Sequence, residues 1–295
     1  MEAYVLAVAI FVAIYALLTL GLNLQYGLTG LTNFGLVGFF AIGAYASAIL
    51  STMGYPILLG FAAGILISVA AAWPIGLIAL RLRDDYFAIA TLGFSEVVRV
   101  AIISEGELTA GVQGIPGIPR LFAFAEARTA QPLLVLGTLL LVNLAVVLAM
   151  RRIVRSPFGR IIGAIRDNEE AVSALGKDPA RFKTQVLMVG AALSALGGSF
   201  YAHYVGYVTP DQFIPLVTFQ IWMAMILGGA GKISGAVIGT LVLMLLLEGS
   251  RFLPDVLPFV SGAAMAEIRI FAVGFALVLF TLYRPQGLMG DFTQR

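Results

Sequence analysis

Residues 3–22 read AYVLAVAIFVAIYALLTLGL, and this stretch decides the class of fold. It contains no Asp, Glu, Lys or Arg, and none of these residues follows it until Arg81. A run of about 20 apolar residues is long enough to cross a bilayer as one helix. Soluble proteins keep charged side chains on their surface, so a water-soluble domain is excluded for this part of the chain. The N-terminal 80 residues are expected to be membrane helices.

The composition extends this conclusion to all 295 residues. Hydrophobic residues make up 60% of the chain and charged residues only 12%, where soluble domains average about 25%. The 33 glycines suit helices that pack closely in lipid. The chain has no cysteine, which excludes disulfides, zinc-thiolate sites and iron-sulfur clusters.

Hydrophobic runs of spanning length predict an all-α, polytopic membrane bundle of about nine transmembrane helices, in a single domain of residues 1–295. The predicted spans lie near residues 3–22, 27–50, 57–80, 86–103, 131–150, 184–205, 213–229, 233–250 and 268–283. The spans at 213–229 and 233–250 are short, so one of them is a candidate re-entrant segment.

Basic residues orient these helices, because cytoplasmic loops are enriched in Lys and Arg. Eight of the 18 basic residues fall in residues 151–183, which marks this segment as a cytoplasmic loop. The same reasoning places the C-terminus in the cytoplasm, and residues 104–130 and the N-terminus outside. The net charge of +2 then reflects topology, and no nucleic-acid partner is expected.

Residues 23–38, NLQYGLTGLTNFGLVG, combine four glycines with polar side chains at membrane depth. Irregular backbone at that depth must be buried in protein or line a wet cavity. We therefore expect this segment to contribute to a passage, together with one ionisable residue of the helix at 86–103. The candidate lining residues are Asn23, Gly30, Thr32, Asn33 and Glu96.

The charged residues inside the spans have two interpretations. Glu96 and Arg99 lie three apart on one helix face, so they either mark a functional site or neutralise each other. Glu248 and Arg251 invite the same two interpretations. His203 is the only histidine, which excludes a multi-histidine metal site and favours a helix-end histidine bonded to a neighbour. Neither a catalytic site nor a cofactor is expected.

Small residues recur at four-residue spacing in three helices and leave smooth strips there. Such strips serve packing within the bundle or a subunit interface. The series are Gly60, Gly64, Ser68 and Ala72; Ala191, Ala195 and Ser199; and Gly231, Gly235 and Gly239.

Within the cytoplasmic loop, residues 159–178 predict a short helix over 168–175. Asp167 is the expected N-cap, with Glu170 completing a capping box. Gly176 suits a left-handed stop, and Pro179 prevents continuation. The helix is either part of a solvated loop or a knob that fits a partner's groove, with Val172 and Leu175 as an apolar edge.

Residues 170–176, EAVSALG, resemble the E-A-A-x-x-x-G loop of ABC importer permeases, with Val172 in place of the second Ala. The resemblance covers about residues 15–290 and is greatest to the M-type subunit of the high-affinity branched-chain amino acid permeases. The other matching segments are residues 27–45, 85–94 (DYFAIATLGF), 159–176, 201–203 (YAH) and 284–288 (RPQGL).

This resemblance implies the ABC importer permease fold and a multi-pass protein of the bacterial inner membrane. It implies four kinds of partner: a second homologous permease subunit, two cytoplasmic ATP-binding subunits, a periplasmic substrate-binding protein and membrane lipid. It also implies that the loop helix in residues 151–183 couples transport to the ATPases. The coupling residues would be Arg166, Asp167, Glu169, Glu170, Ala171 and Gly176.

Transport of branched-chain, hydrophobic amino acids is thus the expected function. Permeases of the same family for urea or short amides, and an ion-coupled secondary transporter, are the alternatives. An enzyme is not expected. Residues 228–233, GGAGKI, fail the phosphate-loop pattern because Ile226 and Ile233 occupy its first Gly and its Ser/Thr positions, so ATP must be hydrolysed by partner subunits.

Overall fold

The computed structural model describes residues 2–79, 82, 84–122 and 130–249, and, further along the chain, residues 271, 274–275, 278, 282–283 and 286–289. Its long helices are α1 (Glu2–Leu22), α2 (Leu36–Thr52), α3 (Ile57–Ala79), α4 (Asp84–Ser104), α6 (Ala130–Arg155), α9 (Pro179–Val205), α10 (Pro215–Gly228) and α11 (Ile233–Gly249). The shorter elements are α5 (Gly106–Thr109), α7 (Pro157–Asp167), α8 (Glu169–Ala174), a π-helix (Asn23–Gly27), two 3-10 turns (Gly111–Gln113 and Pro210–Gln212), and the strands β1 (Ile115–Pro116) and β2 (Tyr207–Val208).

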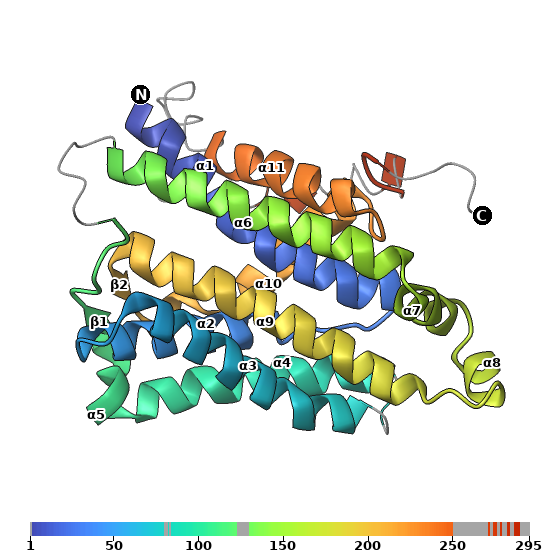
Figure 1. The fold of residues 1–295 in the computed structure, drawn as a ribbon. Coiled ribbons are helices and arrows are strands. Elements are labelled where there is room, and N and C mark those ends of the chain that lie inside the picture. The colour runs from blue at the N-terminus through green and yellow to red at the C-terminus, as the bar shows by residue number, and fades with distance from the viewer. Residues whose placement is uncertain are drawn as a thin grey trace.

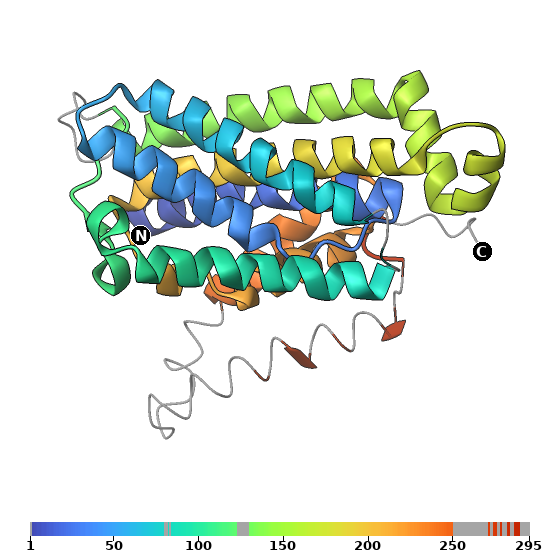
Figure 2. The same cartoon turned by 90° about the horizontal axis from the view of Figure 1, so that it is seen from below.

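The long helices run side by side along one common direction, with α9 packed against α1, α2 and α3 (Figure 1). Helices α7 and α8 project from one end of the bundle, whereas α5, β1, β2 and the start of α1 lie at the other. The view turned by 90° has the same two ends (Figure 2). We call them the α8 end and the β end. The N-terminus is thus on the same side as residues 104–122, as the predicted topology requires.

Six helical segments of the described residues are long and apolar enough to cross a membrane. They are Ala3–Gly27, Ile57–Ile78, Asp85–Ser104, Ala130–Arg155, Pro179–Val205 and Pro210–Gly228. Leu36–Thr52 and Ile233–Glu248 are shorter apolar helices. Eight of the nine predicted spans thus correspond to helices of the structure. The ninth, 268–283, lies mostly outside the described residues, so the total of nine stays a prediction.

Two predicted boundaries were wrong. Helix α2 begins at Leu36, nine residues after the predicted start of its span, because residues 30–35 are not helical and Gly30 has a φ of +77°. Helix α9 begins at Pro179, before the predicted residue 184. The Asp178 carboxylate caps it by accepting from the Ala180 N–H at 3.1 Å, and proline suits the first helical position.

The small-residue strips pack within the bundle. Gly43 of α2 lies against the backbone of Ala195 in α9, and Ser199 Oγ donates to the Gly43 carbonyl at 3.2 Å. Gly64 of α3 approaches Gly43 from another side. In the α10–α11 hairpin, Gly239 lies against the backbone of Gly228. The packing interpretation of these strips is therefore confirmed for the described residues.

The β end holds the sole histidine. His203 is buried, and its Nδ1 lies 2.6 Å from the Pro119 carbonyl oxygen while Nε2 lies 2.8 Å from Ser47 Oγ. This confirms a histidine bonded to its neighbours near a helix end. Strand β1 pairs antiparallel with β2, and Ile115 and Ile118 are buried in the main core. Residues 115–118, within the segment 104–130 that is predicted to lie outside, therefore pack against the helix bundle.

Candidate functional site

The polar segment after α1 forms a buried hydrogen-bond network. Asn33 Nδ2 donates to Gln25 Oε1 at 3.0 Å, and Gln25 Nε2 donates to the Leu187 carbonyl of α9 at 3.3 Å. The Gly35 N–H donates to Asn33 Oδ1 at 2.8 Å, and Trp222 Nε1 of α10 donates to the Asn33 carbonyl at 3.0 Å. Buried polar groups need such partners. The network therefore fixes an irregular stretch between α9 and α10.

Two threonines from other helices complete this arrangement. Thr91 Oγ1 of α4 accepts from the Phe34 N–H at 3.0 Å, and Thr218 Oγ1 of α10 accepts from the Val37 N–H at 3.1 Å. The Phe34 ring stacks on Trp222 with centroids 4.8 Å apart. Helices α4 and α10 thus satisfy three backbone groups of this segment: the N–H groups of Phe34 and Val37 and the carbonyl of Asn33.

Four of the five candidate lining residues belong to this segment. Asn23 and Asn33 are fully buried, whereas Gly30 and Thr32 are half-buried. The Asn23 Oδ1 accepts from the Gly231 N–H at 2.8 Å, but its Nδ2 is buried without a hydrogen-bond partner among the described residues. That these residues line a passage stays a prediction.

Glu96 is placed on α4, where Arg99 Nη2 approaches its Oε2 at 2.9 Å. The ion pair between these two residues is thus confirmed, and that Glu96 lines a passage stays a prediction. The predicted partner of Glu248, Arg251, lies outside the described residues. Among the described residues, the Tyr4 hydroxyl donates to Glu248 Oε2 at 3.0 Å, which ties α1 to the end of α11.

The α8 end connects directly to the irregular segment through one arginine. Arg166, in the last turn of α7, donates from Nη1 to the Gly27 carbonyl at 2.5 Å. Gly27 is the last residue of the π-helix, and π-helical turns are frequent at functional sites. The loop of α10–α11 meets the same point, because Gly231 packs against both the Gly27 backbone and Arg166.

The position of the short loop helix was predicted correctly, but its N-cap residue was not. Helix α8 covers Glu169–Ala174, and its N-cap is Asn168, whose side chain accepts from the Ala171 N–H at 3.0 Å. Asp167 is the last residue of α7, so the predicted capping box with Glu170 was wrong. Gly176 has a φ of +74°, which confirms the left-handed stop.

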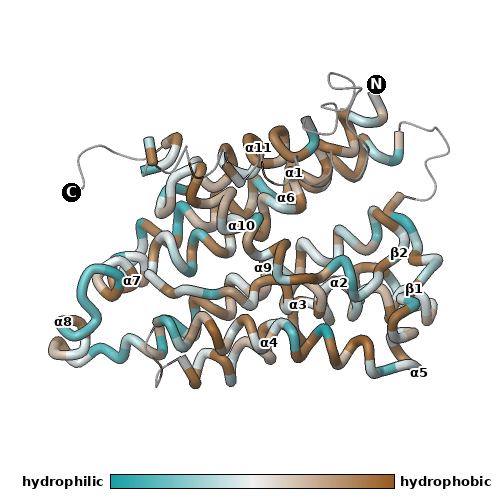
Figure 3. Tube along the Cα trace, turned by 180° about the vertical axis from the view of Figure 1, so that it is seen from behind, coloured by the Kyte–Doolittle hydropathy of each residue, from teal (hydrophilic) through white to brown (hydrophobic). Residues whose placement is uncertain are grey.

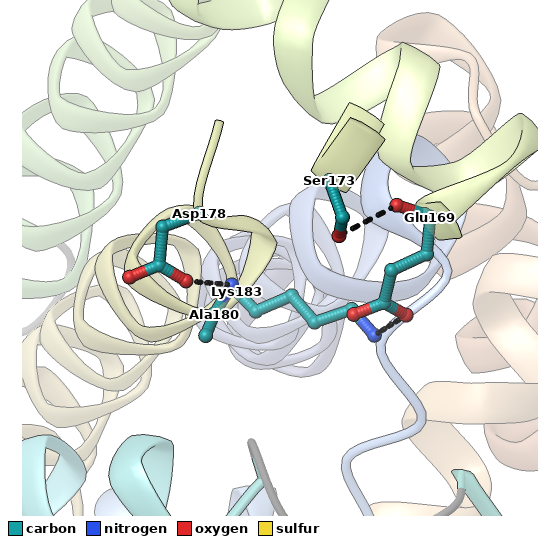
Figure 4. Close-up of polar contacts among 5 residues, drawn as sticks. All are labelled: Glu169, Ser173, Asp178, Ala180 and Lys183. Atoms are coloured by element: carbon teal, nitrogen blue, oxygen red, sulfur yellow. Dashed lines mark hydrogen bonds and ion pairs between the residues drawn. The ribbon is translucent and has the colours of Figure 1, made fainter. Parts of the chain in front are cut away.

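Helix α8 is fastened to the start of α9 by an ion pair that the sequence did not reveal. Lys183 Nζ donates to Glu169 Oε2 at 2.6 Å, and Figure 4 shows the lysine reaching across to the carboxylate. Ser173 Oγ donates to the Glu169 carbonyl at 3.1 Å. Lys183 is 14 residues from Glu169, too far for the helical spacing rules to indicate the pair.

The two residues of the expected apolar edge of this helix differ in exposure. Val172 is buried, whereas Leu175 is 80% exposed at the tip. Asp167, Glu170, Ala171 and Gly176 are also exposed. In Figure 3 the chain around α8 is hydrophilic, in contrast to the apolar long helices. The molecule thus presents a small, fastened helix with a polar surface and one apolar tip.

Three or more His, Asp or Glu side chains do not gather into a metal-binding group anywhere in the described ranges. The α8 end instead has an exposed surface. It is connected to α9 by the ion pair of Glu169 with Lys183, and to the π-helix by the hydrogen bond of Arg166 with Gly27.

Comparison with known proteins relates this architecture to a family. Residues 4–281 match the model of the family described as branched-chain amino acid transport system / permease component. The high-affinity branched-chain amino acid transport system permease protein LivM of Escherichia coli K12 is 33% identical over 308 aligned residues, covering 96% of this chain and 69% of that protein.

Two other relatives are matched over most of their length. A probable branched-chain amino acid transport permease protein LivM of Methanocaldococcus jannaschii is 25% identical, and the LivH permease of Salmonella typhimurium is 28% identical, each covering 94% of this chain and 91% of the relative. No solved structure matches the chain. Given the extent of these matches and the apolar helices, this chain is a multi-pass membrane protein that belongs to the branched-chain amino acid permease family of ABC transporters.

Proposed function

We propose that the chain is the M-type permease subunit of an ATP-driven importer for branched-chain amino acids in a bacterial inner membrane. Helix α8 is the observation that carries this proposal. A six-residue helix held by the Asn168 cap, the Gly176 stop and the Lys183–Glu169 pair has a defined shape that a solvated loop does not need. Such a shape suits the groove of an ATPase subunit.

The proposed complex contains a second homologous permease subunit, two cytoplasmic ATP-binding subunits and a periplasmic substrate-binding protein. Similarity to both LivM and LivH proteins supports a pair of related permeases. In this arrangement residues 151–183 form the cytoplasmic loop of a single permease domain, and the C-terminus is cytoplasmic. The permease itself is not an enzyme.

The proposed coupling path starts at the exposed surface of α8 and the residues beside it, with Asp167, Glu170, Ala171 and Gly176. A displacement of α8 would pull on α9 through the ion pair between Glu169 and Lys183. It would pull on the π-helix through the hydrogen bond between Arg166 and Gly27. The buried Asn23 Nδ2 favours a segment whose hydrogen bonds rearrange during transport, because an unsatisfied buried donor typically costs about 1–3 kcal/mol.

The proposed passage uses Asn23, Gly30, Thr32, Asn33 and Glu96. A branched-chain amino acid is a zwitterion with a small apolar side chain, so dipolar backbone groups and weak apolar contacts suit its transit. The non-helical residues 30–35 offer such groups. Urea or a short amide would use the same kind of surface, so the substrate must be tested directly.

The decisive experiment purifies the tagged chain from a detergent extract and reconstitutes the complex in proteoliposomes with its binding protein. We expect ATPase subunits to copurify, and labelled leucine to enter only with ATP. Uptake driven by an ion gradient without ATP would favour a secondary transporter, and ATP-driven uptake of urea in place of leucine would reassign the substrate.

A further inference from the structure

We propose that the corner between α6 and α7 binds the phosphate of an anionic phospholipid. An open pocket of about 580 Å³ lies at this corner and is lined by Leu148, Arg151, Arg152, Arg155 and Ser156. Its three guanidinium groups all come from the last turns of one helix. The family match and the coupling helix do not account for this cluster.

The pocket lies at one end of a strip of exposed leucines on α6. Leu134, Leu141, Leu144 and Leu148 are between 42% and 69% exposed. They follow one another at spacings of seven, three and four residues, which places them on one helix face. Arg151 and Arg155 continue that spacing. Acyl chains along the leucines would therefore bring a headgroup to the arginines.

The arginines also lie at the depth of lipid headgroups. Between Gln131 and Arg151, residues 132–150 are uncharged and span about 28 Å at about 1.5 Å per residue. The hydrocarbon core of a bilayer is about 30 Å thick. Residues 151–155 thus emerge where the headgroup region begins, at the end that the basic residues assign to the cytoplasm.

The charge of the cluster is available to a ligand. The ion pairs found within the described part of the chain are Arg99–Glu96 and Lys183–Glu169, and neither involves these three arginines. A guanidinium group can hold a phosphate through two parallel hydrogen bonds. Basic pockets beside membrane helices on the cytoplasmic side bind anionic headgroups in this way.

An amphiphile fits this corner better than a soluble anion does. Leu148 lines the pocket together with the arginines, so one molecule would contact apolar and cationic surface at once. A free phosphate would use only the cationic part. The site is on α6, away from the exposed tip of α8, so an ATPase seated on α8 need not cover it (Figure 1).

The test measures lipid retention by the full chain, purified in detergent with the subunits that copurify. Dioleoyl phosphatidylglycerol, dioleoyl phosphatidylcholine and inorganic phosphate are titrated in turn, and bound lipid is read by native mass spectrometry. We expect Arg151→Gln/Arg155→Gln to weaken phosphatidylglycerol retention at least about tenfold. The control Lys177→Gln/Arg181→Gln removes the same charge from exposed positions at the α8 end. This variant should retain phosphatidylglycerol as the wild type does.

Several results would overturn the proposal. Equal losses in the two double variants would mean general attraction to a basic surface. Phosphatidylcholine binding as tightly as phosphatidylglycerol would mean apolar contact alone, and phosphate displacing the lipid at similar concentration would mean a soluble-anion site. If the glutamine variant does not fold, Arg151→Lys/Arg155→Lys replaces it. That variant keeps the charge but loses the paired hydrogen bonds, and unchanged retention would contradict binding by the guanidinium groups.

Discussion

Arg166 and Gly27 are separated by 139 positions in the sequence, yet the guanidinium Nη1 of Arg166 lies 2.5 Å from the Gly27 carbonyl oxygen. The contact joins the last turn of α7 to the end of a π-helix in the membrane domain. A charged donor makes this hydrogen bond stronger than a neutral one. In the proposed coupling path, a movement of α7 and α8 would act through this contact on the segment that follows α1.

The first prediction follows from this contact. Arg166→Gln should reduce ATP-driven leucine uptake at least about tenfold, because a hydrogen bond to a charged group contributes about 1.5–3 kcal/mol. Abundance in the membrane should be normal, since α7 keeps its Ser156 cap and its buried Ile162 and Ile165. Arg160→Gln, at an exposed position of the same helix, is the matched control. Equal uptake by the two variants would show that the contact carries no coupling.

The second prediction concerns close packing. Gly43→Val should lower the melting temperature of the detergent-purified protein by several degrees, because a Cβ at Gly43 would overlap the Ala195 backbone and overpacking costs about 1–3 kcal/mol or more. Gly137→Val is the matched control, since no other atom lies near a Cβ at that position on α6. A melting temperature that falls equally in both variants would contradict this role of Gly43.

The helices were predictable from the sequence because their signals are local, whereas their partners were not. Apolar runs marked eight helices, and the Gly176 stop marked the end of α8. The cap was misassigned because Asp167 and Asn168 are equally suitable residue types. Helix α7 continues through Asp167, so only Asn168, with φ −160° and ψ 101°, has the extended backbone that a cap requires.

The segment that forms the candidate site was predictable for a similar reason, but the contacts of its residues were not. Polar residues within 23–38 indicated irregular backbone, but their partners Leu187 and Trp222 lie more than 150 residues along the chain. No spacing rule connects such positions. The Lys183–Glu169 and Arg166–Gly27 contacts likewise depend on how α7, α8 and α9 pack together.

The third prediction is topological and uses the absence of cysteine from the chain. Val112→Cys, at a site 65% exposed at the β end, should react with an impermeant thiol reagent in spheroplasts. Lys177→Cys, exposed at the α8 end, should react only after the membrane is opened. Val112 is a better site than the neighbouring Gly114, which is buried and has a φ of +71°. Labelling of position 177 in intact spheroplasts would reverse the proposed orientation.

The fourth prediction separates passage from packing in the irregular segment. Asn33→Leu removes two buried side-chain hydrogen bonds, and each partner left unsatisfied costs about 1–3 kcal/mol. Its abundance should therefore fall. Thr32→Val changes a half-buried position. It should lower uptake while assembly with the ATPases, measured by copurification, is unchanged. Normal uptake by Thr32→Val would remove this residue from the proposed passage.

The last prediction tests α8 as the coupling helix. Gly176→Val forces a β-branched residue to a φ of +74°, which costs roughly 1–2 kcal/mol, and Glu170→Lys reverses a charge on the exposed surface. Neither change touches the membrane core, so both variants should insert at normal abundance. A displaced or oppositely charged α8 cannot fit the same groove, so substrate-stimulated ATP hydrolysis of the reconstituted complex should be lost. Gly176→Asn, which tolerates the left-handed conformation, and Glu170→Gln should keep most of it. Wild-type stimulation in Gly176→Val and Glu170→Lys would reduce α8 to a solvated connection and deprive the importer proposal of its principal structural support.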